Sequence, residues 1–198
     1  MMTPKQIERV KIKITKIKKA LAADKKHWGG HHHDGQGLRY LPPEQYLKIQ
    51  DYTGALRYFN WFNKNFSDDS CYPLFLLEWT ITLFKTKKIK ETENKLIETF
   101  ISNTYIIDKF LNIEFKYFDK TESSNWEFES LAEGLPYSNN QNELIDFTSW
   151  LEKFMLTDKF LVPTNRYIEL RVLLKKETDL EKRSDLIDQQ SKISEDLD

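Results

Sequence analysis

The chain has 198 residues, which is long enough for one domain with a substantial core. Its formal charge of −1 excludes a global electrostatic attraction to nucleic acid or to membranes. The charge is uneven, however, because residues 1–26 carry nine Lys and Arg against two acids, while residues 177–198 carry eight acids against three bases. The chain therefore has a basic head and an acidic tail.

Cysteine usage and hydropathy favour a cytoplasmic protein without membrane contact. Cys71 is the only cysteine, so no intrachain disulfide can form. Lysines interrupt every apolar run in the first thirty residues, which argues against a signal peptide. No segment has the roughly 20 consecutive apolar residues of a membrane helix. Low glycine and proline content with 14% aromatic residues favours an all-α fold over a turn-rich β sandwich.

Residues 4–26 predict a basic amphipathic helix. Thr3 can cap it, and Pro4 is favoured as a first helical residue. Apolar residues recur every three or four positions and form one stripe: Ile7, Val10, Ile14, Ile17 and Leu21. The stripe indicates docking on the rest of the domain, with the lysines in solvent. A basic helix that contacts phosphates or anionic lipid is the alternative.

The loop that follows holds all four histidines, at positions 27 and 31–33, and Asp34 comes directly after them. Histidine and carboxylate are good zinc ligands. In an extended segment His31 and His33 point the same way and His32 does not. The candidate metal ligands are therefore His31, His33 and Asp34. The spacing matches no standard zinc signature and four glycines lie nearby, so we expect a flexible, solvent-facing loop instead.

Four core helices are expected next. Asp34 can cap a helix over about 36–49, kinked by Pro42-Pro43, or the regular helix begins only at Pro42. A second helix over 53–65 has an aromatic face and places Ala55 where two helix backbones can come close. A third, over 72–84, is the most apolar and should be central, with Trp79 in the core. A fourth runs over about 89–101.

These helices resemble a known repeat family. The segment Asp51-Tyr52-Thr53-Gly54-Ala55-Leu56-Arg57-Tyr58-Phe59 resembles the second helix of a tetratricopeptide repeat. Ala55 and Thr92 are equivalent small positions 37 residues apart, which is the usual 34-residue period plus three. The pattern Asp34-Gly35-x-Gly37-x-Arg39-Tyr40 is also similar to a group of bacterial repeat proteins without known activity. The resemblance covers residues 34–111.

The resemblance implies stacked helix hairpins with N- and C-terminal capping helices. It also implies a concave groove, lined by the first helix of each pair. Carried over by position, the partner-binding residues at one end are Tyr40, Glu44, Leu47 and Lys48. The other end, Leu74, Leu77, Ile81 and Phe84, is almost wholly apolar and should be covered by the chain itself.

Beyond the repeats, periodicity disappears over residues 112–141 and returns over 142–154 and from about Thr164 to 176. We expect a long connection that is either functional or packed as an arm along the surface, two C-terminal helices, and a solvated helix in the charged tail 177–198. The sequence thus predicts one helical domain over 1–176 followed by a tail.

No catalytic motif is found, and no cofactor is expected. The chain has no phosphate-binding Gly-rich loop and no Gly-x-Ser-x-Gly elbow, and Cys71 has no histidine near it in sequence. We therefore expect a non-catalytic helical-repeat scaffold that mediates protein–protein interaction. Two alternatives are a nucleic-acid-binding protein that uses the N-terminal helix and a metal-binding protein that uses residues 27–34.

Overall fold

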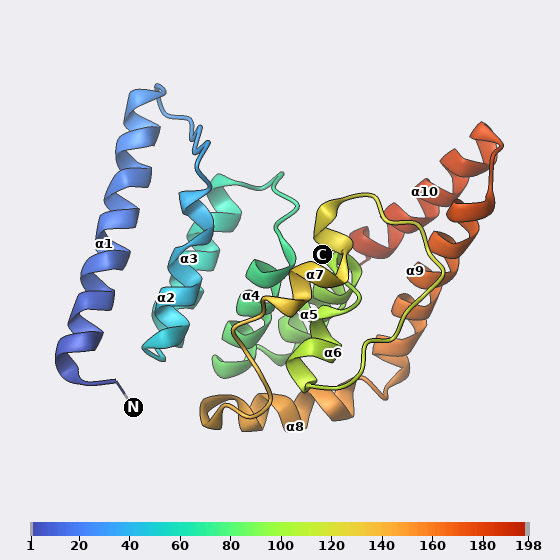
Figure 1. Ribbon diagram of the computed structural model, residues 1–198. Coiled ribbons are helices and arrows are strands. Elements are labelled where there is room, and N and C mark those ends of the chain that lie inside the picture. Colours follow the sequence, from blue (N-terminus) through green and yellow to red (C-terminus); the bar gives the residue numbers. More distant parts are fainter. Residues whose placement is uncertain (1, 197–198) are drawn as a thin grey trace. The chain divides into compact units, whose positions relative to one another are not determined.

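A computed structural model describes residues 2–196, and every regular element within that range is helical (Figure 1). The all-α prediction is confirmed. Within the same range, no helix combines the length and the apolar composition needed to cross a membrane. Met1, and Leu197 and Asp198 of the predicted tail, lie outside the described residues.

The described residues form two compact units, where the sequence predicts a single domain. Unit 1 holds residues 2–71 and 81–88, and unit 2 holds residues 72–80 and 89–196. The division passes through α4 (Pro73–Lys85). Each unit is therefore described by itself.

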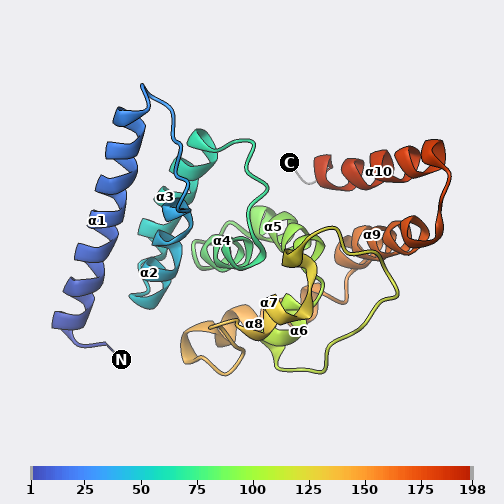
Figure 2. The same cartoon turned by 45° about the horizontal axis from the view of Figure 1, so that its top comes forward.

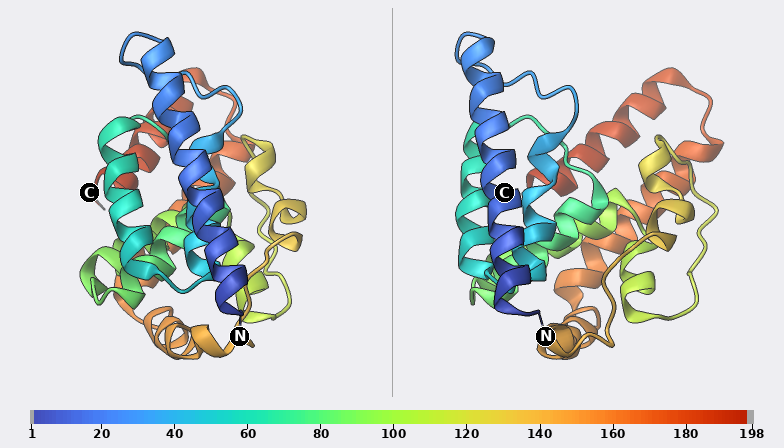
Figure 3. Two further views of the ribbon diagram at one scale, coloured as in Figure 1. Left: turned by 90° about the vertical axis from the view of Figure 1, so that its left-hand side faces the viewer. Right: turned by 60° about the vertical axis from the view of Figure 1, so that its left-hand side comes forward.

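Unit 1 begins with α1 (Pro4–His27), which runs alongside α2 (Pro42–Lys48) and α3 (Tyr52–Asn65) (Figures 1 and 3). The Thr3 hydroxyl accepts a hydrogen bond from Gln6 N, and the Gln6 side chain accepts one from Thr3 N. This capping box satisfies two N–H groups that the helix itself leaves unpaired. Three residues of the predicted stripe are buried: Ile14, Ile17 and Leu21. The predicted docking helix is confirmed.

The kinked helix over 36–49 was wrong, and the alternative start at Pro42 is correct. Leu38–Tyr40 forms a short 3-10 turn, η1, and α2 begins at Pro42. The physical reason is that both prolines then occupy the first two helical positions, where a missing N–H costs no intrahelical hydrogen bond.

The α2–α3 turn requires a glycine at position 54. Asp51 caps α3 by accepting a hydrogen bond from Gly54 N at 2.8 Å. A Cβ atom at Gly54 would lie 2.3 Å from Asp51 Oδ2 and 2.7 Å from the Tyr46 ring, distances that real Cβ atoms essentially never show. Ala55, the predicted small position, is fully buried. The two helices can therefore pack closely at this point.

Unit 2 has a core built from aromatic and leucine side chains, among them Phe110, Phe147, Leu151 and Leu170. The unit begins with residues 72–80, most of which belong to α4, and its other elements come later in the chain (Figure 2). They are α5 (Ile89–Ser102), α6 (Ile106–Leu111), η2 (Asn125–Glu127), α7 (Glu129–Glu133), η3 (Asn142–Leu144), α8 (Ile145–Phe154), α9 (Asp158–Lys176) and α10 (Leu180–Glu195).

The connection over residues 112–141 packs on unit 2 as the predicted arm. Arg171 of α9 is buried; its Nη2 donates to Thr121 O at 2.6 Å and its Nη1 donates to Ser123 Oγ at 2.7 Å. Asn103 Nδ2 donates to Trp126 O at 2.7 Å, and Tyr137 OH donates to Glu78 Oε1 at 2.8 Å. The arm is therefore held by polar contacts to α9, to the end of α5 and to α4.

Two expectations for the helices need correction. Trp79, expected in the core, is only half-buried, with Lys95 Nζ 4.3 Å from its ring centroid, and the fully buried aromatic of this helix is Phe75. Helix α9 begins at Asp158 rather than near Thr164, so Pro163 lies inside it and removes one backbone hydrogen bond.

Helix α10 has no buried residue and is the predicted solvated helix.

The assignment of residues to the unit 1 core can be tested by substitution. Phe59→Ala should lower the free energy of unfolding by about 3–5 kcal/mol, because Phe59 is fully buried and its truncation leaves a cavity. Ile12→Ala, on the exposed outer face of α1, should change it by less than about 0.5 kcal/mol. Urea titration measures both, and equal losses would contradict the assignment of Phe59 to the core.

Candidate functional site

Two carboxylates fix the second half of the histidine loop. Asp24 Oδ2 accepts hydrogen bonds from His33 N at 2.8 Å and from Asp34 N at 3.1 Å. Asp34 is buried, and its two carboxylate oxygens accept from Leu38 N and Arg39 N, each at 2.9 Å. The prediction that Asp34 caps a helix over 36–49 is wrong, because no such helix forms; Asp34 instead bonds two amides of the short turn η1. The sequence predicts a loop that faces solvent throughout. In the structure, this part of the loop lies against the helices instead.

Arg39 joins the loop to the segment that leads into α4. Its Nη1 lies 3.1 Å from Asp34 Oδ2, and its Nε lies 2.7 Å from Asp69 Oδ2. Tyr40 OH also donates to Asp69 Oδ1, at 2.6 Å. Burial by itself would raise the pKa of Asp69, but hydrogen bonds from Tyr40, Cys71 N and Arg39 outweigh it and lower that pKa. The Asp69 carboxylate is therefore held ionised beside the Arg39 guanidinium.

The three predicted metal ligands, His31, His33 and Asp34, lie in different environments. His33 stacks on Trp28 with ring centroids 4.9 Å apart, His31 is exposed, and the Asp34 carboxylate is occupied by Arg39 and two backbone amides. Among residues 2–196, no three His, Cys, Asp or Glu side chains are arranged to hold a metal ion. The structure does not bring the three predicted ligands together.

His32, which the sequence left out of the candidate set, is the buried histidine of the loop. Its side chain is 4% exposed and packs edge-on against Trp61, with centroids 5.5 Å apart. Neither ring nitrogen has a hydrogen-bond partner, since the nearest carboxylate oxygen, Asp24 Oδ2, is 3.9 Å from Nδ1. Burial, and then the positive charge of Lys25, lowers the pKa of His32. The imidazole is therefore neutral at neutral pH.

A cavity of about 240 Å³ opens beside His32, inside unit 1. Tyr58 and Trp61 of α3 form one wall, and Tyr58 is held in place because its OH donates to Arg39 O at 2.6 Å. The opposite wall is one face of α1, with residues at spacings i, i+3, i+4 and i+7: Lys18, Leu21, Ala22 and Lys25. That spacing was visible in the sequence, but only the fold shows that it faces His32.

The predicted partner-binding residues are only partly available at the surface. Leu47 is 6% exposed, and the Tyr40 hydroxyl is bonded to Asp69. Glu44 and Lys48 form an i,i+4 ion pair on the outside of α2. At the other end of the predicted groove, three of the four residues are buried: Leu77, Ile81 and Phe84. Partner binding at Tyr40, Glu44, Leu47 and Lys48 stays a prediction, and only Glu44 and Lys48 extend outward.

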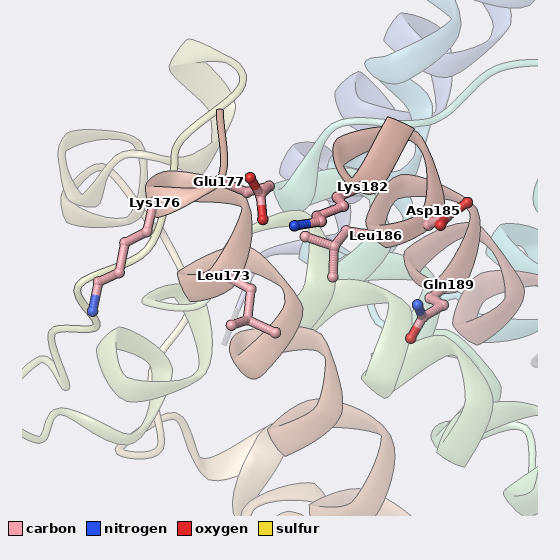
Figure 4. Close-up of a pocket in the computed structure, with 7 residues that line it drawn as sticks. All are labelled: Leu173, Lys176, Glu177, Lys182, Asp185, Leu186 and Gln189. Atoms are coloured by element: carbon pink, nitrogen blue, oxygen red, sulfur yellow. The ribbon is translucent and has the colours of Figure 1, made fainter. Parts of the chain in front are cut away.

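A different opening runs along the α9–α10 hairpin of unit 2. Near the turn it has a volume of about 400 Å³. Figure 4 shows Leu173 of α9 and Leu186 of α10 bordering this space, while Lys176 extends away from it. The other lining residues are polar or charged: Glu177, Lys182, Asp185 and Gln189.

A second opening of about 370 Å³ lies toward the other end of the same helices, with Val162 on α9 and Ile193 on α10. Between the two openings, Arg166 Nη2 of α9 donates to Gln189 Oε1 of α10 at 2.5 Å. We call the two openings, which this hydrogen bond separates, the α9–α10 groove; Asn94 and Ile97 of α5 also line the second opening.

Comparison with known proteins adds no relative: the chain matches no family model, no curated protein and no solved structure.

The Arg39 ion pairs give a prediction about stability. Arg39→Met should lower the free energy of unfolding by about 3–5 kcal/mol, because it leaves the Asp34 carboxylate, 2% exposed, without its charged partner. Lys48→Met is the matched control, since it removes the same charge from an exposed pair and should cost less than about 1 kcal/mol. Similar losses in chemical denaturation would show that the buried carboxylates do not depend on Arg39.

His32 gives a prediction about pH. In the unfolded chain a histidine takes up a proton near its ordinary pKa of about 6.5, whereas the lowered pKa of His32 in the folded chain resists protonation. The unfolded state therefore binds more protons, and stability falls as the pH drops from about 7 toward 5. His32→Phe should flatten this fall.

Comparing the unsubstituted chain with His32→Phe isolates the effect of His32. The charged groups around it are present in both proteins: Asp24, Asp34 and Lys25. Urea titrations of both proteins across that pH range measure the effect. Parallel curves would mean that His32 titrates alike in the folded and unfolded chains.

Proposed function

We propose that the chain is a non-catalytic helical protein that binds a partner protein, and that the α9–α10 groove receives an amphipathic helix of that partner. The observation that carries the proposal is the state of α10. None of its residues from Leu180 to Glu195 is buried, and the groove beside it leaves Leu173 and Val162 exposed. An open apolar groove between two helices commonly binds the apolar face of a third, amphipathic helix.

The groove suits a helix because its apolar side chains recur at helical spacing. On α9, Val162 and Leu173 lie three turns apart with Arg166 between them, and on α10, Leu186 and Ile193 are seven residues apart. The charged residues of the lining carry both signs: Lys159, Arg166, Lys176 and Lys182 against Glu177, Asp185 and Asp196. This balance supports a helix of mixed charge and disfavours a polyanion such as nucleic acid.

The scaffold proposed for this role is tetratricopeptide-like, in a bacterial cytoplasm. Helices α2 and α3 form one hairpin within unit 1, and Ala55 and Thr92, the two equivalent small positions, are both fully buried. Burial of a small residue at each position is what a repeat needs for close helix contacts. The single cysteine, Cys71, is buried and cannot form an intrachain disulfide, which suits a reducing compartment.

The proposal predicts that the groove captures its partner through Leu173 and Leu186. A photo-crosslinking residue in place of Gln189 should yield one cross-linked protein in the source cells. The cross-linked peptide should have an apolar stripe at helical spacing. Leu173→Lys or Leu186→Lys should weaken binding of that protein at least about tenfold, because each places a charge against the apolar stripe.

Leu156→Lys is the matched control, since Leu156 is an exposed leucine outside the groove lining. Equal weakening by the control and the groove variants would rule the groove out as the binding surface. A cross-linked peptide without helical periodicity would rule out the proposed occupant.

Nucleic-acid binding by α1 is the second candidate, and one observation favours it. Eight of the nine Lys and Arg residues of α1 are exposed: Lys5, Arg9, Lys11, Lys13, Lys16, Lys18, Lys19 and Lys26. Phosphate contacts of this kind would weaken steeply as salt rises. An electrophoretic shift in a salt series distinguishes the two candidates, because the groove proposal predicts no shift.

A further inference from the structure

We infer that the unit 1 cavity beside His32 binds a small aromatic carboxylic acid. This inference concerns a different site from the α9–α10 groove and does not depend on the proposed partner protein. It rests on three features of the cavity: an unpartnered imidazole, a lining whose charged groups are all positive, and aromatic walls of a suitable size.

The first feature is the unsatisfied polarity of His32. Both of its ring nitrogens are buried without a hydrogen-bond partner. A buried polar group left unpaired is destabilising, so such groups are nearly always bonded to protein, water or ligand. A neutral imidazole offers one N–H donor and one acceptor nitrogen. Neither nitrogen is exposed to the cavity in this structure, so the imidazole would have to turn for a carboxylate at its end of the cavity to accept the hydrogen bond from that N–H.

The second feature is charge. Lys18 and Lys25 line the cavity, and no acidic residue lines it. The nearest carboxylate, Asp24, is already occupied by the amides of His33 and Asp34. Lys25 Nζ donates to Asn65 Oδ1 at 2.8 Å, which holds its ammonium group next to the cavity. A bound anion would therefore meet two ammonium groups, and no acid lines the cavity itself.

The lining also favours a carboxylate over a phosphate. Proteins usually hold phosphate with arginine forks or with the backbone N–H groups of a helix N-terminus. The cavity has no arginine in its lining, and the face of α1 that borders it is taken from the second half of that helix. Two lysines and one imidazole are donors that a carboxylate can satisfy.

The third feature is the apolar body of the cavity. Tyr58 and Trp61 lie with ring centroids 5.2 Å apart, and Leu21 and Ala22 face them from α1. An apolar cavity of about 150 Å³ holds benzene, so a cavity of about 240 Å³ has room for one aromatic ring and a short acid side chain. Water in the cavity would leave these aromatic and aliphatic walls wetted.

The experiment is an NMR titration of the full chain with benzoate, phenylacetate and indole-3-acetate. The Trp61 indole N–H signal, assigned with Trp61→Phe, and the His32 ring signals report on the cavity. We expect saturable shifts, and dissociation constants at least about tenfold lower for the best acid than for benzamide, which lacks the charge, or acetate, which lacks the ring. Phenyl phosphate should bind more weakly than that acid.

Three variants locate the site. Ala22→Leu should abolish binding, because it fills the cavity from a solvent-exposed helical position that tolerates leucine. Lys18→Met should weaken the acids about tenfold and leave benzamide unchanged. Lys19→Met is the matched control, since Lys19 is exposed on α1 outside the cavity lining, and it should have no effect. Circular dichroism confirms that each variant is folded.

Three results would overturn the inference. The first is that none of the acids saturates below about 10 mM, which would leave water as the only occupant. The second is that Lys18→Met and Lys19→Met affect binding equally, which would reduce the charge effect to a nonspecific one. The third is that phenyl phosphate binds more tightly than every acid, which would assign the cavity to phosphates.

Discussion

The pairing of Arg39 with Asp34 and Asp69 is the interaction on which the rest of unit 1 depends. A carboxylate as deeply buried as Asp34 is stable only with a fixed counter-charge and filled hydrogen bonds. Arg39 supplies the charge, and two backbone amides fill the remaining positions. Because Asp69 lies thirty residues further along the chain, the same guanidinium also joins the loop before α2 to the loop after α3. One side chain thus sets the course of two connections.

The candidate cavity is a consequence of that arrangement. Tyr58 is held through its bond to the Arg39 carbonyl, and the loop that carries His32 is held where Asp24 and Asp34 bind its backbone. A side chain fixed in this way can keep an unpartnered imidazole next to an open space, whereas a mobile loop would turn it toward solvent. The burial of His32 is therefore a property of the surrounding hydrogen bonds, and its lowered pKa follows from that burial.

Unit 2 uses a second buried arginine in a similar way. Arg171 of α9 binds the carbonyl of Thr121 and pairs with Glu127, so it fixes the arm over residues 112–141. In both units an arginine holds a long connection against helices, because its planar group can bond several acceptors at once. Helix α10 is held at two places: Arg183 near its start bonds the end of α9, and Arg166 of α9 bonds Gln189 near its middle. Most of the helix stays exposed, and we propose it as the element that receives a partner.

The local pattern of the sequence determined the helices, because periodicity and capping depend only on neighbouring residues. Thr3 and Pro4 marked the start of α1, and Asp34 was recognised as an acceptor for nearby backbone N–H groups. Other predictions depended on distant contacts and failed: the core position of Trp79 and the exclusion of His32. Arg39 has no partner until Asp69 arrives from another loop, and His32 has no cavity until α1 and α3 lie on either side of it. The sequence by itself therefore determined which segments are helical, whereas the tertiary structure decided which charges are buried and where a ligand can enter, since burial is set by residues far apart in the chain.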